Sequence, residues 1–157
     1  MNTVNLLLGN SEEPINDLLE ALVQEVCGDR AAVKSIRTGR TDEFIRLSCE
    51  QQFELLILVP HELSPDPSEP AMLSHIGEAV RTIRLIRSQN ATPLVAIVSP
   101  ENRQENEPLL MSAGAHCLLE LPLNHEGFKA TVGRLLDSHL QSQPSAPARQ
   151  RKSFFGF

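Results

Sequence analysis

The stretch from Glu54 to Pro60, "ELLILVP", decides the fold prediction. Its five residues from Leu55 to Val59 are all apolar. A continuous apolar run, rather than an alternating one, is typical of a parallel strand that is covered on both faces. In an open parallel sheet, ligands usually bind at the carboxyl ends of the strands. Val59 and Pro60 are therefore expected to lie where chemistry would take place.

Similar apolar runs alternate with helical patterns along the whole chain. Strands are expected at 3–8, 31–38, 55–59, 94–98 and 117–121. Helices are expected from a Ser11 cap to Val26, at 41–51, at 71–89, from about Pro108 to Ala113, and from an Asn124 cap to Leu140. This alternation predicts a flavodoxin-like α/β domain, with a five-stranded parallel sheet in the order 2-1-3-4-5 and helices on both faces.

Charge and composition argue against a nucleic-acid partner. The chain has a net charge of −6 and contains no Trp or Tyr, so it offers neither a basic surface nor many stacking platforms. The charge is uneven, because residues 141–157 carry +3, which leaves −9 for residues 1–140.

Neither an export signal nor a metal site is evident. The first residues lack a basic region before an apolar core, and no apolar run is long enough to span a membrane, so we expect a cytoplasmic protein. Cys27, Cys49 and Cys117 form no CxxC pair, which predicts free thiols and no zinc site. No cofactor is expected.

The composition changes after residue 140. Residues 1–140 are predicted to form the domain, and 141–157 a flexible Gln/Ser/Pro linker with a basic-aromatic tail. The tail holds Arg149, Arg151, Lys152, Phe154, Phe155 and Phe157. It is either a disordered end without a role or a short motif whose aromatic side chains dock on a partner protein. Three cations alone would bind a membrane surface only marginally.

Residues 112–136, "SAGAHCLLELPLNHEGFKATVGRLL", resemble the last part of the receiver domain of bacterial response regulators. The Ala113-Gly114-Ala115 turn and Pro122 match that pattern, as do Gly39 and the Thr92-Pro93 pair. The resemblance spans about residues 3–140 and implies the same fold as the alternation of strands and helices does.

The residues that carry the receiver's chemistry are missing at the matching positions. Its acidic pair falls on Gly9 and Asn10, its phospho-accepting aspartate on Val59, and its lysine on Leu121. Its Ser/Thr falls on Ser99 or on Val98. A valine methyl cannot attack phosphorus, and Mg²⁺ prefers carboxylate oxygens, which this set lacks. The resemblance therefore implies a pseudo-receiver without phosphotransfer.

Other polar groups have ordinary explanations. Glu12 and Glu13 suit the first turn of a helix but could also act as displaced metal ligands. His61, with Glu62, Asp66 and Glu69, belongs to a solvated loop or to a proton-transfer site. Arg81, Arg84 and Arg87 predict a solvated helix face or a surface for an acidic partner.

The sequence thus predicts a protein-interaction, scaffold or localisation module, not an enzyme. Receivers commonly bind partners through the fourth helix, fifth strand and fifth helix, and a homodimer is compatible with that face. By resemblance its exposed residues are Leu109, His116, Glu120 and Lys129, supported by Leu110, Ala113, Phe128 and Val132. Two alternatives stay open: a small-molecule sensor that uses the uncharged crevice, and an enzyme built on Asn10, Ser99 and His61.

Overall fold

The structure, a computed structural model, describes residues 2–60 and 75–142. Five strands form one parallel sheet in the order β2-β1-β3-β4-β5, which confirms the prediction. The strands are β1 (Asn2–Gly9), β2 (Ala31–Thr38), β3 (Leu55–Leu58), β4 (Leu94–Val98) and β5 (Cys117–Glu120). The helices are α1 (Glu13–Cys27), α2 (Thr41–Glu50), α3 (His75–Arg87), α4 (Pro100–Ala113) and α5 (His125–Ser142).

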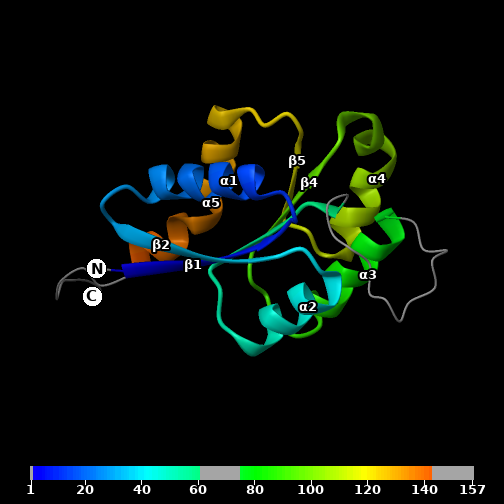
Figure 1. Ribbon diagram of the computed structural model, residues 1–157, viewed down its shortest axis with the longest axis horizontal. Coiled ribbons are helices and arrows are strands. Elements are labelled where there is room, and N and C mark those ends of the chain that lie inside the picture. The colour runs from blue at the N-terminus through cyan, green and yellow to red at the C-terminus, as the bar shows by residue number, and fades with distance from the viewer. Residues whose placement is uncertain (1, 61–74, 143–157) are drawn as a thin grey trace.

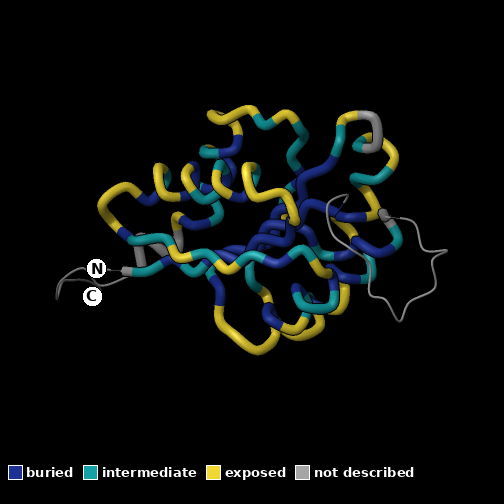
Figure 2. The backbone as a smooth tube through the Cα atoms, in the orientation of Figure 1, coloured by how far each residue is buried: buried dark blue, intermediate teal, exposed yellow. Residues whose placement is uncertain are grey.

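The helices cover both faces of the sheet (Figure 1). Successive residues of β1 point to opposite faces: Leu6 and Leu8 pack with α1 and α5, whereas Leu7 packs with α2, α3 and α4. Every residue of β3 and β4 is buried, while β2 at the edge is buried only at its two ends and is half-buried or exposed between them (Figure 2). Burial on both faces explains the continuous apolar runs of the central strands.

The prediction for α4 was wrong. The helix begins at Pro100, not near Pro108, and Pro108 lies inside it. Pro100 suits the first turn, where a backbone N–H has no helical partner. Pro108 removes the helical hydrogen bond to the carbonyl of Gln104, which is an exposed residue, so that carbonyl can bond to water instead, and burial of Leu110 favours the continued helix.

The other boundaries differ less. Glu12, not Ser11, is the N-cap of α1, and it makes no side-chain capping bond. Asn124 caps α5 as predicted, since its Oδ1 accepts a hydrogen bond from the Gly127 N–H at 2.7 Å. The predicted start of α3 at 71–74 lies outside the described residues. Within the described ranges, every helix is too short or too polar to cross a bilayer, and the cysteines are free, with Cys27 buried and Cys49 exposed.

Candidate functional site

The carboxyl ends of β1, β3, β4 and β5 bring together the five residues that the sequence singled out. Because the strands are parallel, their carboxyl ends lie on the same side of the sheet. That side carries Gly9, Asn10, Val59, Ser99 and Leu121. The Val59 N–H donates to the Gly9 carbonyl at 3.0 Å, and the Leu121 N–H donates to the Val98 carbonyl at 3.0 Å. We call this region the strand-end site.

Val59 and Leu121 make the strand-end site apolar. Val59 has no exposed surface and belongs to the hydrophobic cluster beneath α1 and α5. Leu121, which is partly buried, packs against the same cluster. A charge placed among these side chains would lose its hydration without gaining a partner.

Gly9 is closed off by Phe44 of α2, a residue that the sequence did not single out. A Cβ atom added to Gly9 would lie 2.7 Å from Phe44 Cδ1, which is closer than two carbon atoms approach. Phe44 itself is fully buried. This strand end therefore has no space for a side chain, because the aromatic ring occupies it.

Asn10 is engaged within the protein. Its Oδ1 accepts a hydrogen bond from the Glu12 N–H at 3.4 Å, and its Nδ2 donates to Asn16 Oδ1 at 3.3 Å. In return, Asn16 Nδ2 donates to the Asn10 carbonyl at 3.0 Å. Both amides are buried, so they shape the turn from β1 into α1 and satisfy one another. The one sequence signal for Asn16 was that it directly follows Ile15, an apolar residue that packs against the same core.

Acidic ligands for a metal do not gather here in the part of the chain that the structure describes. That part holds no group of three or more His, Cys, Asp or Glu arranged for a metal ion. Glu13 binds the Arg37 guanidinium, and Glu12 is exposed. The loop residues His61, Glu62, Asp66 and Glu69 lie outside the described residues.

Ser99 and Val98, the two candidates for the Ser/Thr position, differ in burial. Val98 is fully buried in β4, whereas Ser99 is half-buried and is the N-cap residue of α4. Ser99 is therefore the polar group that follows this strand.

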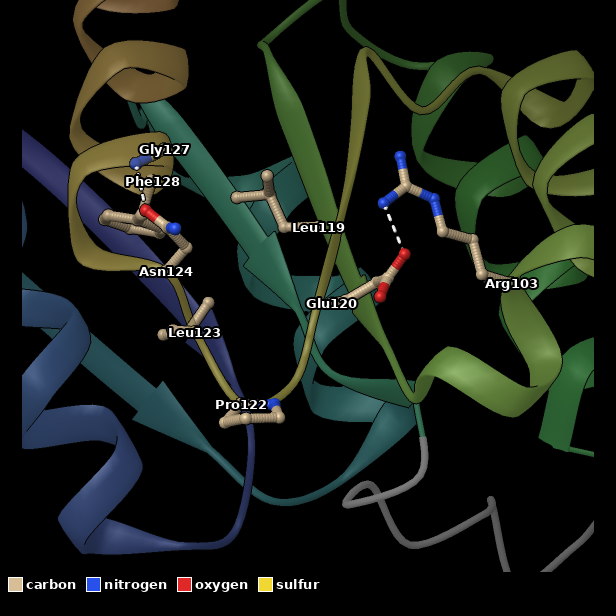
Figure 3. Close-up of a pocket in the computed structure, with 8 residues that line it drawn as sticks. All are labelled: Arg103, Leu119, Glu120, Pro122, Leu123, Asn124, Gly127 and Phe128. Carbon is tan, nitrogen blue, oxygen red and sulfur yellow. Dashed lines mark hydrogen bonds and ion pairs between the residues drawn. The ribbon is translucent and has the colours of Figure 1, made fainter.

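A second region, beside β5, is open. A cleft of about 290 Å³ lies between α4, the β5–α5 connection and the start of α5 (Figure 3). Its lining residues are Arg103, Leu119, Glu120, Pro122, Leu123, Asn124, Gly127 and Phe128. We call this hollow the β5 cleft.

An ion pair forms one wall of the β5 cleft. Arg103 Nη1 lies 2.8 Å from Glu120 Oε2, and Arg103 Nε lies 3.1 Å from Glu107 Oε1. Hydrogen bonds to Glu120 and then Glu107 raise the pKa of Arg103 above its ordinary value. Figure 3 shows Arg103 reaching from α4 towards Glu120 on one side of the β5 backbone. Leu119, Leu123 and Phe128 lie on the other side, and we call them the apolar floor of the cleft.

Only Glu120 of the four expected face residues lines the β5 cleft. Lys129 faces α1 instead, with its Nζ at 3.2 Å from Glu25 Oε1 and 3.1 Å from Glu126 Oε2. Leu109 is 51% exposed. It follows Glu107 by two residues, about 200° around the helix, so it lies on the side of α4 away from Arg103.

His116 lies at the other end of β5. Its Nδ1 accepts a hydrogen bond from the Leu94 N–H at 3.1 Å. His116 is exposed overall, but partial burial of its ring, and then the nearby Arg87 charge, lower its pKa. His116 therefore supports the sheet in its neutral form and lies apart from the cleft.

The arginines of α3 do not share one solvated face. Arg84 is exposed and Arg81 lies 3.8 Å from Glu78, but Arg87 packs over Gly114. A Cβ at Gly114 would lie 2.8 Å from Arg87 Cγ, and burial lowers the pKa of Arg87. The solvated-face interpretation is wrong for Arg87.

Comparison with known proteins identifies the fold. No protein-family model and no curated protein matches the sequence. A response regulator from Clostridium difficile is similar in structure, with a TM-score of 0.65, 18% identity, and coverage of 87% of this chain and 98% of that one.

Two further structures have the same fold. One is the receiver domain of a Pseudomonas aeruginosa sensor histidine kinase with magnesium in its active-site cleft, with a TM-score of 0.63, 15% identity, and coverage of 87% and 99%. The other is a candidate pilus assembly protein (CpaE) from Burkholderia thailandensis, with a TM-score of 0.58, 18% identity, and coverage of 85% and 98%. The chain therefore has the receiver fold.

Proposed function

We propose that the protein is a non-phosphorylatable pseudo-receiver that acts as a protein-interaction, scaffold or localisation module in bacterial signalling. One observation carries the proposal: Val59, at the tip of β3, is fully buried in a hydrophobic cluster. Phosphoryl transfer to a protein side chain needs a nucleophile, and its charge must be stabilised by cations or hydrogen-bond donors. A valine among apolar neighbours supplies neither.

The other residues of the strand-end site support the same proposal. Phe44 occupies the space beside Gly9, and the Asn10 amide is bonded to Asn16 and Glu12. Leu121 stands at the position where the receiver pattern has a lysine, and it packs against the core. Compared with the receiver pattern, Gly9, Asn10, Val59 and Leu121 each stand in place of a charged residue. The strand-end site therefore has no charge there that must be hydrated or paired.

Binding is proposed to use the β5 cleft and the tail, residues 149–157. The cleft combines an apolar floor with polar groups at its wall, as binding sites commonly do. The tail combines three cations with three phenylalanines, which suits an anchor and its steering charges. Assembly of other proteins has a precedent for this fold in the candidate pilus assembly protein.

The test is affinity capture from extracts of the native cell. We expect the full chain to retain a protein partner that is lost when residues 149–157 are deleted. A second variant, with Phe154, Phe155 and Phe157 changed to Ser but with all three cations kept, should lose the same partner. Thermal unfolding should be unchanged in both variants.

A cleft variant, Arg103→Glu, tests the second surface because it reverses the charge that pairs with Glu120. If neither the tail variants nor Arg103→Glu changes what is captured, the proposed surfaces are wrong.

A further inference from the structure

Within the described ranges, phenylalanine is used only for burial. Phe44 and Phe128 have no exposed surface, and Phe53 is 8% exposed. The other three phenylalanines belong to the tail, at positions 154, 155 and 157. Burying a large aromatic side chain is strongly favourable, so these three would gain free energy by packing on an apolar surface.

One part of the β5 cleft is apolar. Its floor is formed by Leu119 and Leu123, which are partly exposed, over the buried Phe128, and the cleft volume of about 290 Å³ suits a side chain rather than a drug-sized ligand. A second hollow between α1 and α5 is less suitable, since Val26 and Ala130 lie there among charged residues.

The tail is long enough to reach the β5 cleft of its own molecule. The cleft lies at the start of α5, and the described helix ends at Ser142 (Figure 1). Eighteen helical residues span about 27 Å. The twelve residues from Ser142 to Phe154 span up to about 40 Å when extended. A tether of this length holds the aromatic residues near the cleft at roughly millimolar effective concentration.

The charges beside the cleft favour a basic segment. Arg103 is paired with two carboxylates, those of Glu107 and Glu120. This group therefore keeps an excess negative charge, which attracts cations at short range and less so at high salt.

We propose that the tail docks in the β5 cleft of the same molecule. At least one of the three tail phenylalanines packs on the apolar floor, and Arg149, Arg151 and Lys152 lie near the surplus carboxylate of the Arg103 group. The inference rests on the proposed function for what this contact regulates: a partner that uses either surface must first separate them. The intramolecular contact itself requires no partner.

The test compares methyl NMR spectra of the purified full chain and a variant with Phe154, Phe155 and Phe157 changed to Ala. An aromatic ring against the cleft floor shifts the Leu119 and Leu123 methyl signals, so these should move in the variant. The Ile36 methyls, on β2 at the other edge of the sheet, are the internal control and should not move. Unchanged Leu119 and Leu123 signals would overturn the proposal.

Gly127→Leu gives an independent check. Gly127 is exposed on α5 and lines the cleft, so a leucine there obstructs the cleft from its rim without disturbing the core. In this background the three Phe→Ala changes should no longer move the Leu119 and Leu123 signals.

Dilution distinguishes the same molecule from a second copy. A tenfold dilution should leave the signals unchanged and the mass monomeric, whereas loss of the shift on dilution would assign the contact to another molecule and contradict the proposal. Because no partner is present, failure here is distinct from failure of the capture experiment.

Discussion

The strand-end site and the β5 cleft both lie at the carboxyl ends of the strands, yet the first is filled by side chains and the second is open. At the strand-end site, Val59 and Phe44 are fully buried, and the Asn10 amide is satisfied by internal hydrogen bonds. In the cleft, the Arg103–Glu120 pair remains partly exposed beside an open hollow. The comparison teaches that this fold can fill the place where ligands usually bind and still present a shaped surface nearby.

The largest expected effect comes from putting a carboxylate into the strand-end site. Val59→Asp should lower the free energy of unfolding by about 3–5 kcal/mol near neutral pH, because the buried charge has no partner. Burial raises the carboxyl pKa, so the folded state binds more protons than the unfolded state, and the loss should shrink as the pH falls. Urea unfolding at about pH 8 and about pH 5 measures both effects.

The control is Val59→Thr, which keeps the shape and replaces one methyl group with a hydroxyl, at a cost of about 1–2 kcal/mol. If Val59→Asp were as stable as Val59→Thr at the higher pH, the strand-end site would have room for charge or water, and the contrast with the cleft would fail.

The same substitution at two glycines should have opposite effects. Gly9→Ala should destabilise by about 1–3 kcal/mol because the methyl collides with the Phe44 ring. Gly127→Ala, at an exposed helical position where a Cβ lies 3.4 Å from Asn124 Oδ1, should instead stabilise by about 0.5 kcal/mol.

Chemical denaturation of both variants measures this difference. Phe44→Leu in the Gly9→Ala background should recover part of the loss, as a double-mutant cycle would reveal. Equal effects at the two glycines would contradict the difference in packing.

His116 tests the sheet at the amino end of β5, away from the cleft. Its pKa is lowered in the folded protein, so its contribution to stability is complete above the ordinary value of about 6.5 and is lost as the pH falls through the folded value. His116→Asn keeps an acceptor for the Leu94 N–H and does not titrate, so it should flatten the pH dependence. His116→Ala should cost about 0.5–1.5 kcal/mol by removing that hydrogen bond. Thermal unfolding across this pH range would refute the assignment if the Asn variant kept the wild-type slope.

The smallest effect is expected in the cleft itself. Arg103→Met should change stability by less than about 1 kcal/mol, because ion pairs exposed to water contribute little. A loss several times larger in urea unfolding would mean that Arg103 supports the fold, rather than a binding surface.

The sheet could be predicted from sequence, and much of the two sites could not. Continuous apolar runs such as Leu94–Val98 identify strands locally, and Asn124 identified the cap of α5 by its type and place. The contact of Phe44 with Gly9 joins residues far apart in sequence, and no local pattern indicates it. Pro108 predicted a helix boundary, but packing of Leu110 overrode it and placed Arg103 beside Glu120.

The central claim is that this receiver fold does not accept a phosphoryl group. Incubation of the full chain with acetyl phosphate and Mg²⁺, followed by intact-mass spectrometry, tests it most directly. The account predicts an unchanged mass for the wild type, and also for Val59→Asp under conditions where it is folded, since the metal ligands and the lysine are still missing. Rapid Mg²⁺-dependent phosphorylation of the wild-type chain would contradict it.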